Sequence, residues 1–257
     1  METLKNIRTL PVSCLFILMM CQAFVVSGQV EISKETTKEK QKKDKKEERD
    51  KVEVDGTTSV FFTSNWSYTT RKLIENDGYF GDSLGARADE TGIGNWSFTL
   101  GFRNQLKDFL LWEGGVAFMQ NGEQYSFEQS DSSYNYQTKY MYIAVPLKLY
   151  YTYGSSVKLL VGAGIVPQMF MGYRQNVQYT TTEGDSDNEE IKTKSGYNSF
   201  VLSAAFNLGV EIELSKSWSA VILPEYKLQL NSTYDKNDSY KHFGRSLGVN
   251  FGFALKL

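Results

Sequence analysis

From residue 56 to the end of the chain, apolar and polar residues alternate in repeated segments. In residues 95–103, Trp96, Phe98, Leu100 and Phe102 share one face of an extended strand, and small or polar residues take the other. A period of two predicts a strand with one apolar face. Eight such segments occur, each about as long as the ~9–11 tilted residues that cross a bilayer. Their apolar positions span residues 60–68, 96–102, 110–118, 141–151, 157–171, 200–212, 218–230 and 247–257.

The connections between these segments alternate in length. Long connections span residues 70–94, 121–139, 174–196 and 231–243, and short ones span residues 104–109, 152–156 and 214–217. Outer-membrane barrels have short periplasmic turns and longer extracellular loops. We therefore predict an all-β fold, an eight-stranded antiparallel up-and-down transmembrane β-barrel, in the outer membrane of a Gram-negative bacterium.

Periodicity alone does not say whether the apolar stripe faces lipid or a core, so a soluble lipocalin-like barrel is the alternative. The strands hold roughly forty large apolar side chains, whereas the interior of such a barrel is only just wide enough for side chains to fill it. The opposite face carries small residues that suit a narrow lumen. They are Gly101, Gly115, Ala117, Gly162, Gly164, Gly172, Ser203, Ala205, Gly209, Gly248, Gly252 and Ala254. The apolar face is therefore predicted to meet lipid.

Amphipathic aromatic rings prefer the headgroup level of a bilayer. The sequence predicts an outer rim at Trp66, Tyr68, Trp96 and Tyr173, and an inner rim at Trp112, Tyr151 and Trp218. Pro146, Pro167 and Pro224 lie within the predicted strands, where each removes a ladder hydrogen bond, so we assign them to bulges or strand ends.

The region before the barrel has two different compositions. Lys5 and Arg8 precede an apolar stretch of 15 residues, 12–26, which small residues follow, in the order of a secretory signal peptide. We predict a signal peptide at residues 1–28, which would remove both cysteines, Cys14 and Cys21. Residues 29–55 are highly charged and nearly free of apolar side chains, which predicts a charged periplasmic linker. The barrel domain is then residues 56–257.

Charged residues fall on the small-residue face of the strands. The chain has 28 basic and 30 acidic residues, so the strongly basic balance of a nucleic-acid binder is absent. Charges inside a narrow barrel must pair, because their desolvation is otherwise too costly. A near-balanced interior predicts a polar plug, with Arg103 and Glu113 as a cross-strand pair, and leaves a small porin as the alternative. The inward charges are Arg103, Lys148, Lys158, Lys227, Lys256, Glu113, Glu211, Glu213 and Glu225.

Three loop features invite a chemical interpretation. His242, the one histidine, is predicted in the last long loop near Asp235, Asp238 and Ser239, where a lipid-modifying enzyme could use it. Such residue types are common in loops, so we predict no enzyme and no catalytic residues. The acidic run Asp185, Asp187, Glu189 and Glu190 lacks the spacing of a calcium site, and neither a metal nor a cofactor is predicted. Tyr125, Phe127, Tyr134 and Tyr136 are a candidate surface recognition patch.

Four segments of the predicted strands resemble the sequences of a known family. YMYIAVPLKLYY (residues 140–151) and VKLLVGAGIVPQMFMGY (residues 157–173) resemble the PorT-like outer-membrane β-barrel family, as do FNLGVEIEL (206–214) and SLGVNFGFALKL (246–257). The resemblance implies a single barrel of the OmpA transmembrane type, with no family catalytic residues to carry over. Such motifs describe strand packing rather than a site.

The predicted function is an integral outer-membrane protein with a structural, surface-interaction or secretion-accessory role. A small porin conducting ions or small solutes is the first alternative, and a lipid-modifying enzyme is the second. The predicted partners are outer-membrane lipid and other envelope or secretion proteins, without nucleic acid, around a monomeric barrel.

Overall fold

The computed structural model describes residues 58–76, 85–129, 132–181 and 185–257. Every described residue belongs to one compact unit, Val54–Leu257. The predicted signal peptide and charged linker lie outside the described residues. Within these residues, no helix is long and apolar enough to cross a membrane.

The described residues form ten strands, all in one antiparallel sheet, and one short 3-10 helix. The strands are β1 (Thr58–Glu75), β2 (Thr91–Lys107), β3 (Leu110–Gln129), β4 (Ser132–Ala144), β5 (Leu147–Gly154), β6 (Val157–Thr180), β7 (Ser186–Thr193), β8 (Phe200–Glu213), β9 (Trp218–Gln229) and β10 (Tyr240–Lys256), with the helix η1 (Gly85–Asp89) between β1 and β2.

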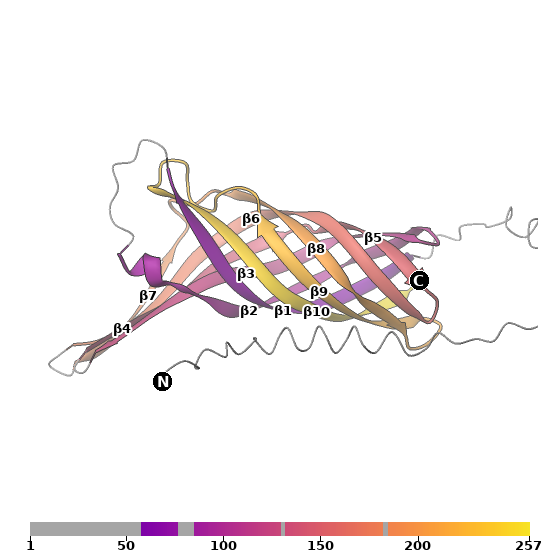
Figure 1. Ribbon diagram of the computed structural model, residues 1–257, viewed down its shortest axis with the longest axis horizontal. Helices are drawn as coiled ribbons and strands as arrows, with labels where there is room; N and C mark the ends of the chain where they lie inside the picture. Colours follow the sequence, from indigo (N-terminus) through magenta and orange to yellow (C-terminus); the bar gives the residue numbers. More distant parts are fainter. Residues whose placement is uncertain (1–57, 77–84, 130–131, 182–184) are drawn as a thin grey trace, which may run out of the picture. The chain divides into compact units, whose positions relative to one another are not determined.

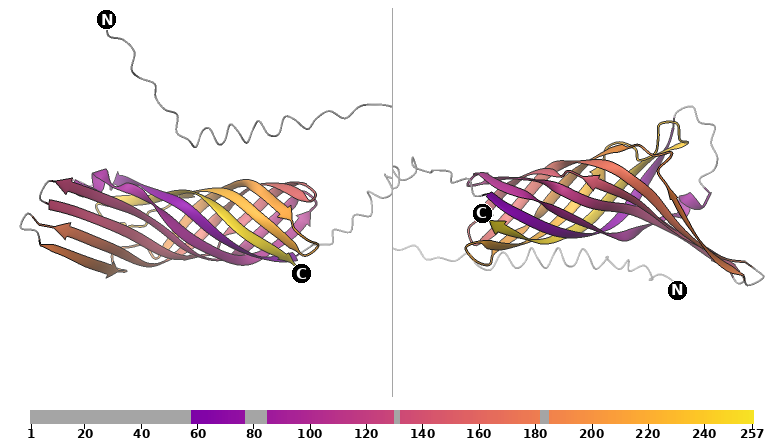
Figure 2. Two further views of the ribbon diagram at one scale, coloured as in Figure 1. Left: turned by 90° about the horizontal axis from the view of Figure 1, so that it is seen from below. Right: turned by 180° about the vertical axis from the view of Figure 1, so that it is seen from behind.

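The sheet closes on itself as a barrel (Figures 1 and 2). β1 pairs with β2 on one side and with β10 on the other, so the first and last strands complete the ring. β4 and β5 both lie between β3 and β6 and act as one interrupted strand, which gives a ring of eight. The predicted fold class, an all-β eight-stranded antiparallel barrel, is confirmed.

The three prolines lie where the hydrogen-bond ladder is interrupted. Val145 and Pro146 separate β4 from β5, and Pro167 on β6 faces this gap, where its carbonyl accepts from the Val145 N–H at 2.9 Å. Pro224 lies within β9, beside a gap in the β8–β9 ladder between the pairs Asn207–Glu225 and Val210–Ile222. Each proline therefore sits where its missing N–H costs little.

The two ends of the barrel differ. The short connections and Lys256 lie at one end, the turn end. At the other end, four strands continue past the ring as a projecting sheet, which we call the paddle (Figures 1 and 2). The paddle consists of residues 124–129 of β3, 132–138 of β4, 174–180 of β6 and all of β7.

The paddle corrects the prediction that residues 121–139 and 174–196 are long loops. Most of these residues belong to hydrogen-bonded hairpins, β3 with β4 and β6 with β7. Their outer face is polar, so the aliphatic alternation that marks a lipid-facing strand is lost. Cross-strand aromatic contacts support the pairing instead, since the rings of Tyr125 and Tyr136 stack with centroids 5.5 Å apart.

The apolar face of the barrel points outward. Trp96, Phe98, Leu100 and Phe102 are 45–58% exposed, whereas the alternate residues of β2 line the interior. The rim residues Trp66, Tyr68, Trp96, Trp112, Tyr151 and Trp218 are also exposed, as predicted.

Tyr173 is the exception to the predicted rim. A register shift beside Met171 and Gly172 reverses the alternation of β6, so Tyr173 packs inward against the buried cluster of Tyr140 and Phe170. The prediction for Tyr173 was therefore wrong, because a bulge inserts one extra residue that the period-two pattern does not count.

Candidate functional site

The lumen near the turn end holds a group of charged side chains, which we call the plug: Arg103, Glu113, Lys148 and Glu225, which are buried, and Glu211, which is partly buried. The register of β2 and β3 places Arg103 directly opposite Glu113, and Arg103 Nε donates to Glu113 Oε2 at 2.8 Å. Arg103 Nη1 also donates to Glu211 Oε2 at 3.3 Å. The predicted cross-strand pair is confirmed, and it extends across the lumen to β8.

A second pair continues the plug. Lys148 Nζ donates to Glu225 Oε2 at 2.6 Å and lies 3.9 Å from Glu113 Oε1, which links the two pairs. Asn207 Nδ2 donates to Glu225 at 3.1 Å. These side chains are buried and paired, so they pack as a polar core inside the barrel. An ion-selective channel would instead carry an excess of one sign along an open path.

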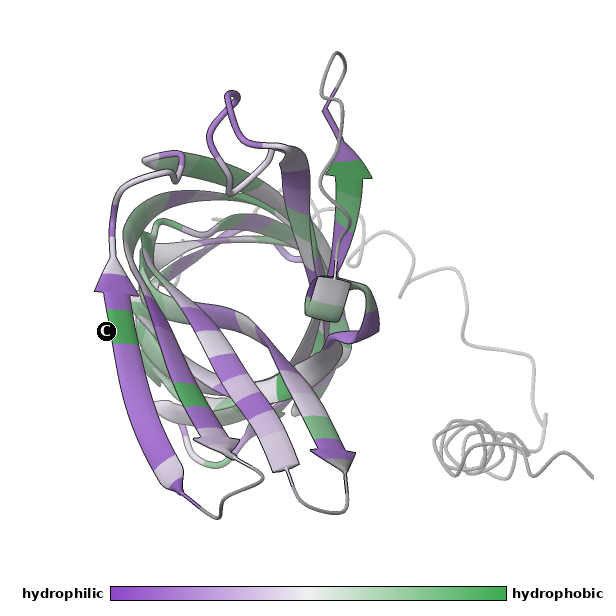
Figure 3. Cartoon of the chain, turned by 90° about the vertical axis from the view of Figure 1, so that its left-hand side faces the viewer, coloured by the Kyte–Doolittle hydropathy of each residue, from purple (hydrophilic) through white to green (hydrophobic). Residues whose placement is uncertain are grey.

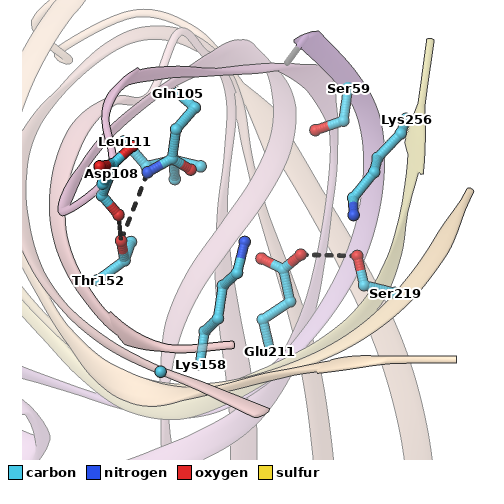
Figure 4. Close-up of a pocket in the computed structure, with 10 residues that line it drawn as sticks. Ser59, Gln105, Asp108, Leu111, Thr152, Lys158, Glu211, Ser219 and Lys256 are labelled. Atoms are coloured by element: carbon cyan, nitrogen blue, oxygen red, sulfur yellow. Dashed lines mark hydrogen bonds between the residues drawn. The ribbon is translucent and has the colours of Figure 1, made fainter. Parts of the chain in front are cut away.

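A cavity of about 260 Å³ opens between the plug and the turn end (Figure 4). Lys158 and Lys256 point into it from β6 and β10, with Glu211 between them in the view. Glu211 is already held by Arg103 and by the Ser219 hydroxyl, which donates at 2.6 Å. Lys256 pairs with Glu213 at 2.9 Å. The cavity is therefore a charge-balanced, polar vestibule.

A second buried network, the Glu123 cluster, lies at the paddle end of the lumen. Glu123 accepts from the Tyr140 hydroxyl at 2.7 Å, and its carboxylate lies 3.8 Å from Arg71 Nε and 3.6 Å from His242 Nε2. Arg71 also pairs with Glu90. Sequence reasoning missed this cluster because it ended the third strand at residue 118. The inward alternation of Ala117, Met119 and Asn121 continues to Glu123 and could have found it.

The structure places His242 differently from the sequence prediction. It lies in β10 rather than in a loop, its side chain is 1% exposed, and its ring is flanked by Tyr140 and Tyr234 with centroids 4.8 and 4.9 Å away. Its carboxylate neighbour is Glu123 and not Asp235 or Asp238. The Ser-His-Asp grouping considered from the sequence is therefore not assembled.

The acidic run considered as a cation site lies mainly on β7. Glu190 pairs with Arg174 at 3.1 Å and with Lys192 at 2.6 Å, and these cations hold the pKa of Glu190 below its usual range. Asp187 accepts from the Tyr179 hydroxyl at 3.3 Å. Among the described residues, no group of three or more His, Cys, Asp or Glu side chains could hold a metal ion.

The aromatic recognition patch lies on the paddle face that continues the lumen. Tyr125, Tyr134 and Tyr136 contact one another through their rings, and Phe127 is exposed beside them. The Tyr136 hydroxyl donates to Glu90, which ties the base of the patch to the Glu123 cluster.

Alkaline titration tests this packing. Burial raises the pKa of Tyr136 to about 12, and burial likewise raises the pKa of Tyr234, in the loop before β10, to about 12. Because the unfolded pKa is about 10, the folded state keeps protons that the unfolded state loses, so stability should fall as the pH rises from 10 to 12. Absorbance titration should show that Tyr136→Phe and Tyr234→Phe each remove a late-titrating phenol. Loss of an early-titrating phenol instead would contradict the packing.

A closed ring of strands, a polar lumen and an outward belt of large apolar side chains define a class of protein. The chain is an outer-membrane β-barrel of the Gram-negative type, and the predicted location is confirmed.

Comparison with known proteins finds solved structures of similar barrels. No family model and no curated protein matches the chain. Similar solved structures include Ail, the attachment invasion locus protein of Yersinia pestis, in complex with a heparin analogue (16% identity, 77% of this chain and 99% of that chain, TM-score 0.29). Another is Neisserial surface protein A (10% identity, 77% and 97% coverage, TM-score 0.35).

A third similar structure is the outer-membrane protease OmpT from Escherichia coli, at 7% identity, 80% and 98% coverage and a TM-score of 0.44. This finding corrects the prediction that the chain is not an enzyme. That prediction was wrong as an exclusion, since the similar solved barrels include a protease.

Proposed function

We propose that the protein is a non-conducting outer-membrane barrel that holds the paddle outside the cell as an interaction surface. One observation carries the proposal: β3, which contributes Glu113 to the plug, also continues beyond the barrel into the paired sheet of the paddle. β3 supplies both Glu113 of the plug and the aromatic residues of the paddle, so the anchor and the exposed surface are one continuous element. A strand-built surface is held more rigidly than a loop.

The orientation follows from the lengths of the connections. Short turns of outer-membrane barrels lie in the periplasm, and the longer elements lie outside. We therefore place the paddle on the cell surface and the turn end in the periplasm. Residues 1–28 would then direct export, and residues 29–55 would form a charged linker in the periplasm. The plug supports a closed barrel over the porin alternative, because its charges are paired across the lumen.

The finer role that we propose is contact with another envelope or secretion protein. The resemblance of residues 140–173 to PorT-like barrels supports this choice, and the exposed aromatic residues of the paddle supply a surface for such a contact.

Removing the paddle tests this function. Residues 124–137 and 174–192 would each be replaced by a two-residue Asn-Gly turn, which joins the paired positions Glu123–Thr138 and Tyr173–Thr193. We expect the shortened barrel to fold and to show the same absence of steady conductance in a planar bilayer as the full chain. Proteins that cross-link to the full chain on intact cells should be lost.

A matched control replaces the turn-end loop at residues 214–217 and should keep the same cross-linked proteins. Steady ion conductance by the full chain would contradict the closed barrel. Unchanged cross-linking after paddle removal would contradict the role given to the paddle.

A further inference from the structure

The outward face of β3, β4 and β6 changes character along the strands. In the part that faces lipid, cross-strand neighbours Phe118, Ile143 and Met169 form an apolar row, and Ile143 and Met169 are 38% and 63% exposed. Met141 follows on β4, and the bulge residue Met171, also exposed, follows on β6. This part of the surface suits acyl chains.

The next row toward the paddle is cationic. Lys139 of β4 lies opposite Arg174 of β6, which lies opposite Lys192 of β7. Like charges directly across strands are destabilising unless an anion lies between them. Glu190 forms ion pairs with both Arg174 and Lys192, whereas Lys139 makes no ion pair with any residue that the structure describes. Two of the three cations therefore share one carboxylate, Lys139 has none, and the row has a surplus of positive charge.

Beyond the cations the same face becomes a field of amides and hydroxyls. It comprises two cross-strand rows on β3, β4 and β6, Gln124, Gln137 and Asn176, then Ser126, Asn135 and Gln178; on β7, Glu190 ends the first row and Asn188 ends the second. A shallow hollow of about 440 Å³ lies over this field, and no charged side chain lines it. In Figure 3 the projecting strands are largely hydrophilic. Side-chain amides both donate and accept, which matches the hydroxyl groups of a sugar.

The three zones follow one another at two-residue steps, each about 7 Å along a strand. From Ile143 to Gln137 the distance along β4 is therefore about 20 Å. Over this distance the surface passes from apolar to cationic to neutral polar groups. An acylated, phosphorylated saccharide has its own groups in the same order, with acyl chains in the membrane, phosphates at its surface and sugars above.

We propose that this face binds one outer-leaflet glycolipid of that chemistry. Lys139 and Arg174 contact its phosphate, the methionines and Ile143 contact its acyl chains, and the amide field contacts its sugars. Arg in particular suits phosphate, because its planar guanidinium forms two parallel hydrogen bonds. The inference rests on the proposed function, since it requires the paddle to lie outside the cell.

The opposite side of the barrel offers a matched control. Lys72 on β1 and Arg245 on β10 also face outward, just beyond the rim residue Tyr68 and its cross-strand neighbour Leu247. On the same face, the described residues beyond Lys72 and Arg245 are the exposed Ile74, with Phe243 and Lys241 on β10, and none of these three is an amide. This pair therefore has the charge of the proposed site without its saccharide-binding surface.

The test is calorimetric titration of the full chain in detergent with purified deep-rough lipopolysaccharide. Three paired variants are compared with the unaltered chain: Lys139→Gln with Arg174→Gln, Gln137→Ala with Asn176→Ala, and Lys72→Gln with Arg245→Gln. We expect about a thirtyfold loss of affinity for the first variant, a smaller loss for the second and none for the third. Heat-dependent mobility on a gel checks that each variant is folded.

Two further ligands identify what is recognised. Dephosphorylated lipopolysaccharide should bind the unaltered chain as weakly as the first variant binds the phosphorylated form. Phosphatidylglycerol, which has a phosphate and acyl chains but no saccharide, should bind at least about tenfold more weakly than lipopolysaccharide. Equal losses at Lys72 and Arg245, or equal binding of phosphatidylglycerol, would overturn the site. In that case the paddle-removal experiment still decides the proposed function separately.

Discussion

Replacing Arg103 with methionine is expected to lower the free energy of unfolding by about 3–5 kcal/mol, because it removes the guanidinium that pairs with the buried carboxylate of Glu113 and with Glu211. Arg103 is 1% exposed and holds both Glu113 and Glu211, and its guanidinium also lies 4.8 Å from the ring centroid of Phe61. Methionine keeps most of the volume and removes the charge. The measurement is reversible urea unfolding from lipid bilayers, followed by tryptophan fluorescence.

Lys256→Met is the matched control for this prediction. Lys256 pairs with Glu213 at the mouth of the barrel, where both side chains are about a third exposed (31% and 37%). Solvent screens such a pair, so its loss should cost at most about 1 kcal/mol. Adding Glu113→Gln to Arg103→Met should restore part of the lost stability. Equal costs at Arg103 and Lys256 would contradict a dry, closed lumen.

Placing arginine at Leu100 is expected to destabilise the barrel in a bilayer by about 2–4 kcal/mol, the cost of a lipid-facing charge near the midplane. Leu100 is 58% exposed and lies on β2 midway between Trp96 of the outer rim and Asn104 at the turn end. A residue this exposed would accept arginine with little cost if it faced water. Unfolding in urea from bilayers of defined thickness measures the difference.

Thr70→Arg is the control, since Thr70 faces outward just beyond the rim residue Tyr68. The cost of a charge on the lipid face falls to about 0–1 kcal/mol near the interface. A similar small cost at both positions would mean that Leu100 does not contact the hydrocarbon region.

The parts of the fold that follow from the sequence depend on side chains that repeat every two residues. The alternation at Trp96, Phe98 and Leu100 predicts both the strand and its outward face. Successive residues there alternate without interruption between the lipid-facing side and the side that faces the lumen. The pair of Arg103 and Glu113 follows from the same rule, since a short turn fixes the register of the two strands.

The remaining features depend on information that a period-two pattern does not contain. The bulge beside Met171 turns Tyr173 inward, and only the hydrogen-bond register reveals it. The paddle lacks an aliphatic face, so its strands look like loops in the sequence. His242 meets Glu123 and Tyr140 through closure of the barrel, which brings together residues more than a hundred positions apart.

Tryptophan quenching in bilayers tests most directly whether the apolar face of the barrel meets lipid. The chain has four tryptophans, and Trp66, Trp96, Trp112 and Trp218 are 37–52% exposed on the outward face at the two rims. Phospholipids with bromine on their acyl chains close to the headgroup should quench most of the emission, and bromine near the chain ends should quench less. Emission that is unaffected by brominated lipid but quenched by acrylamide in the water would contradict a lipid-facing belt.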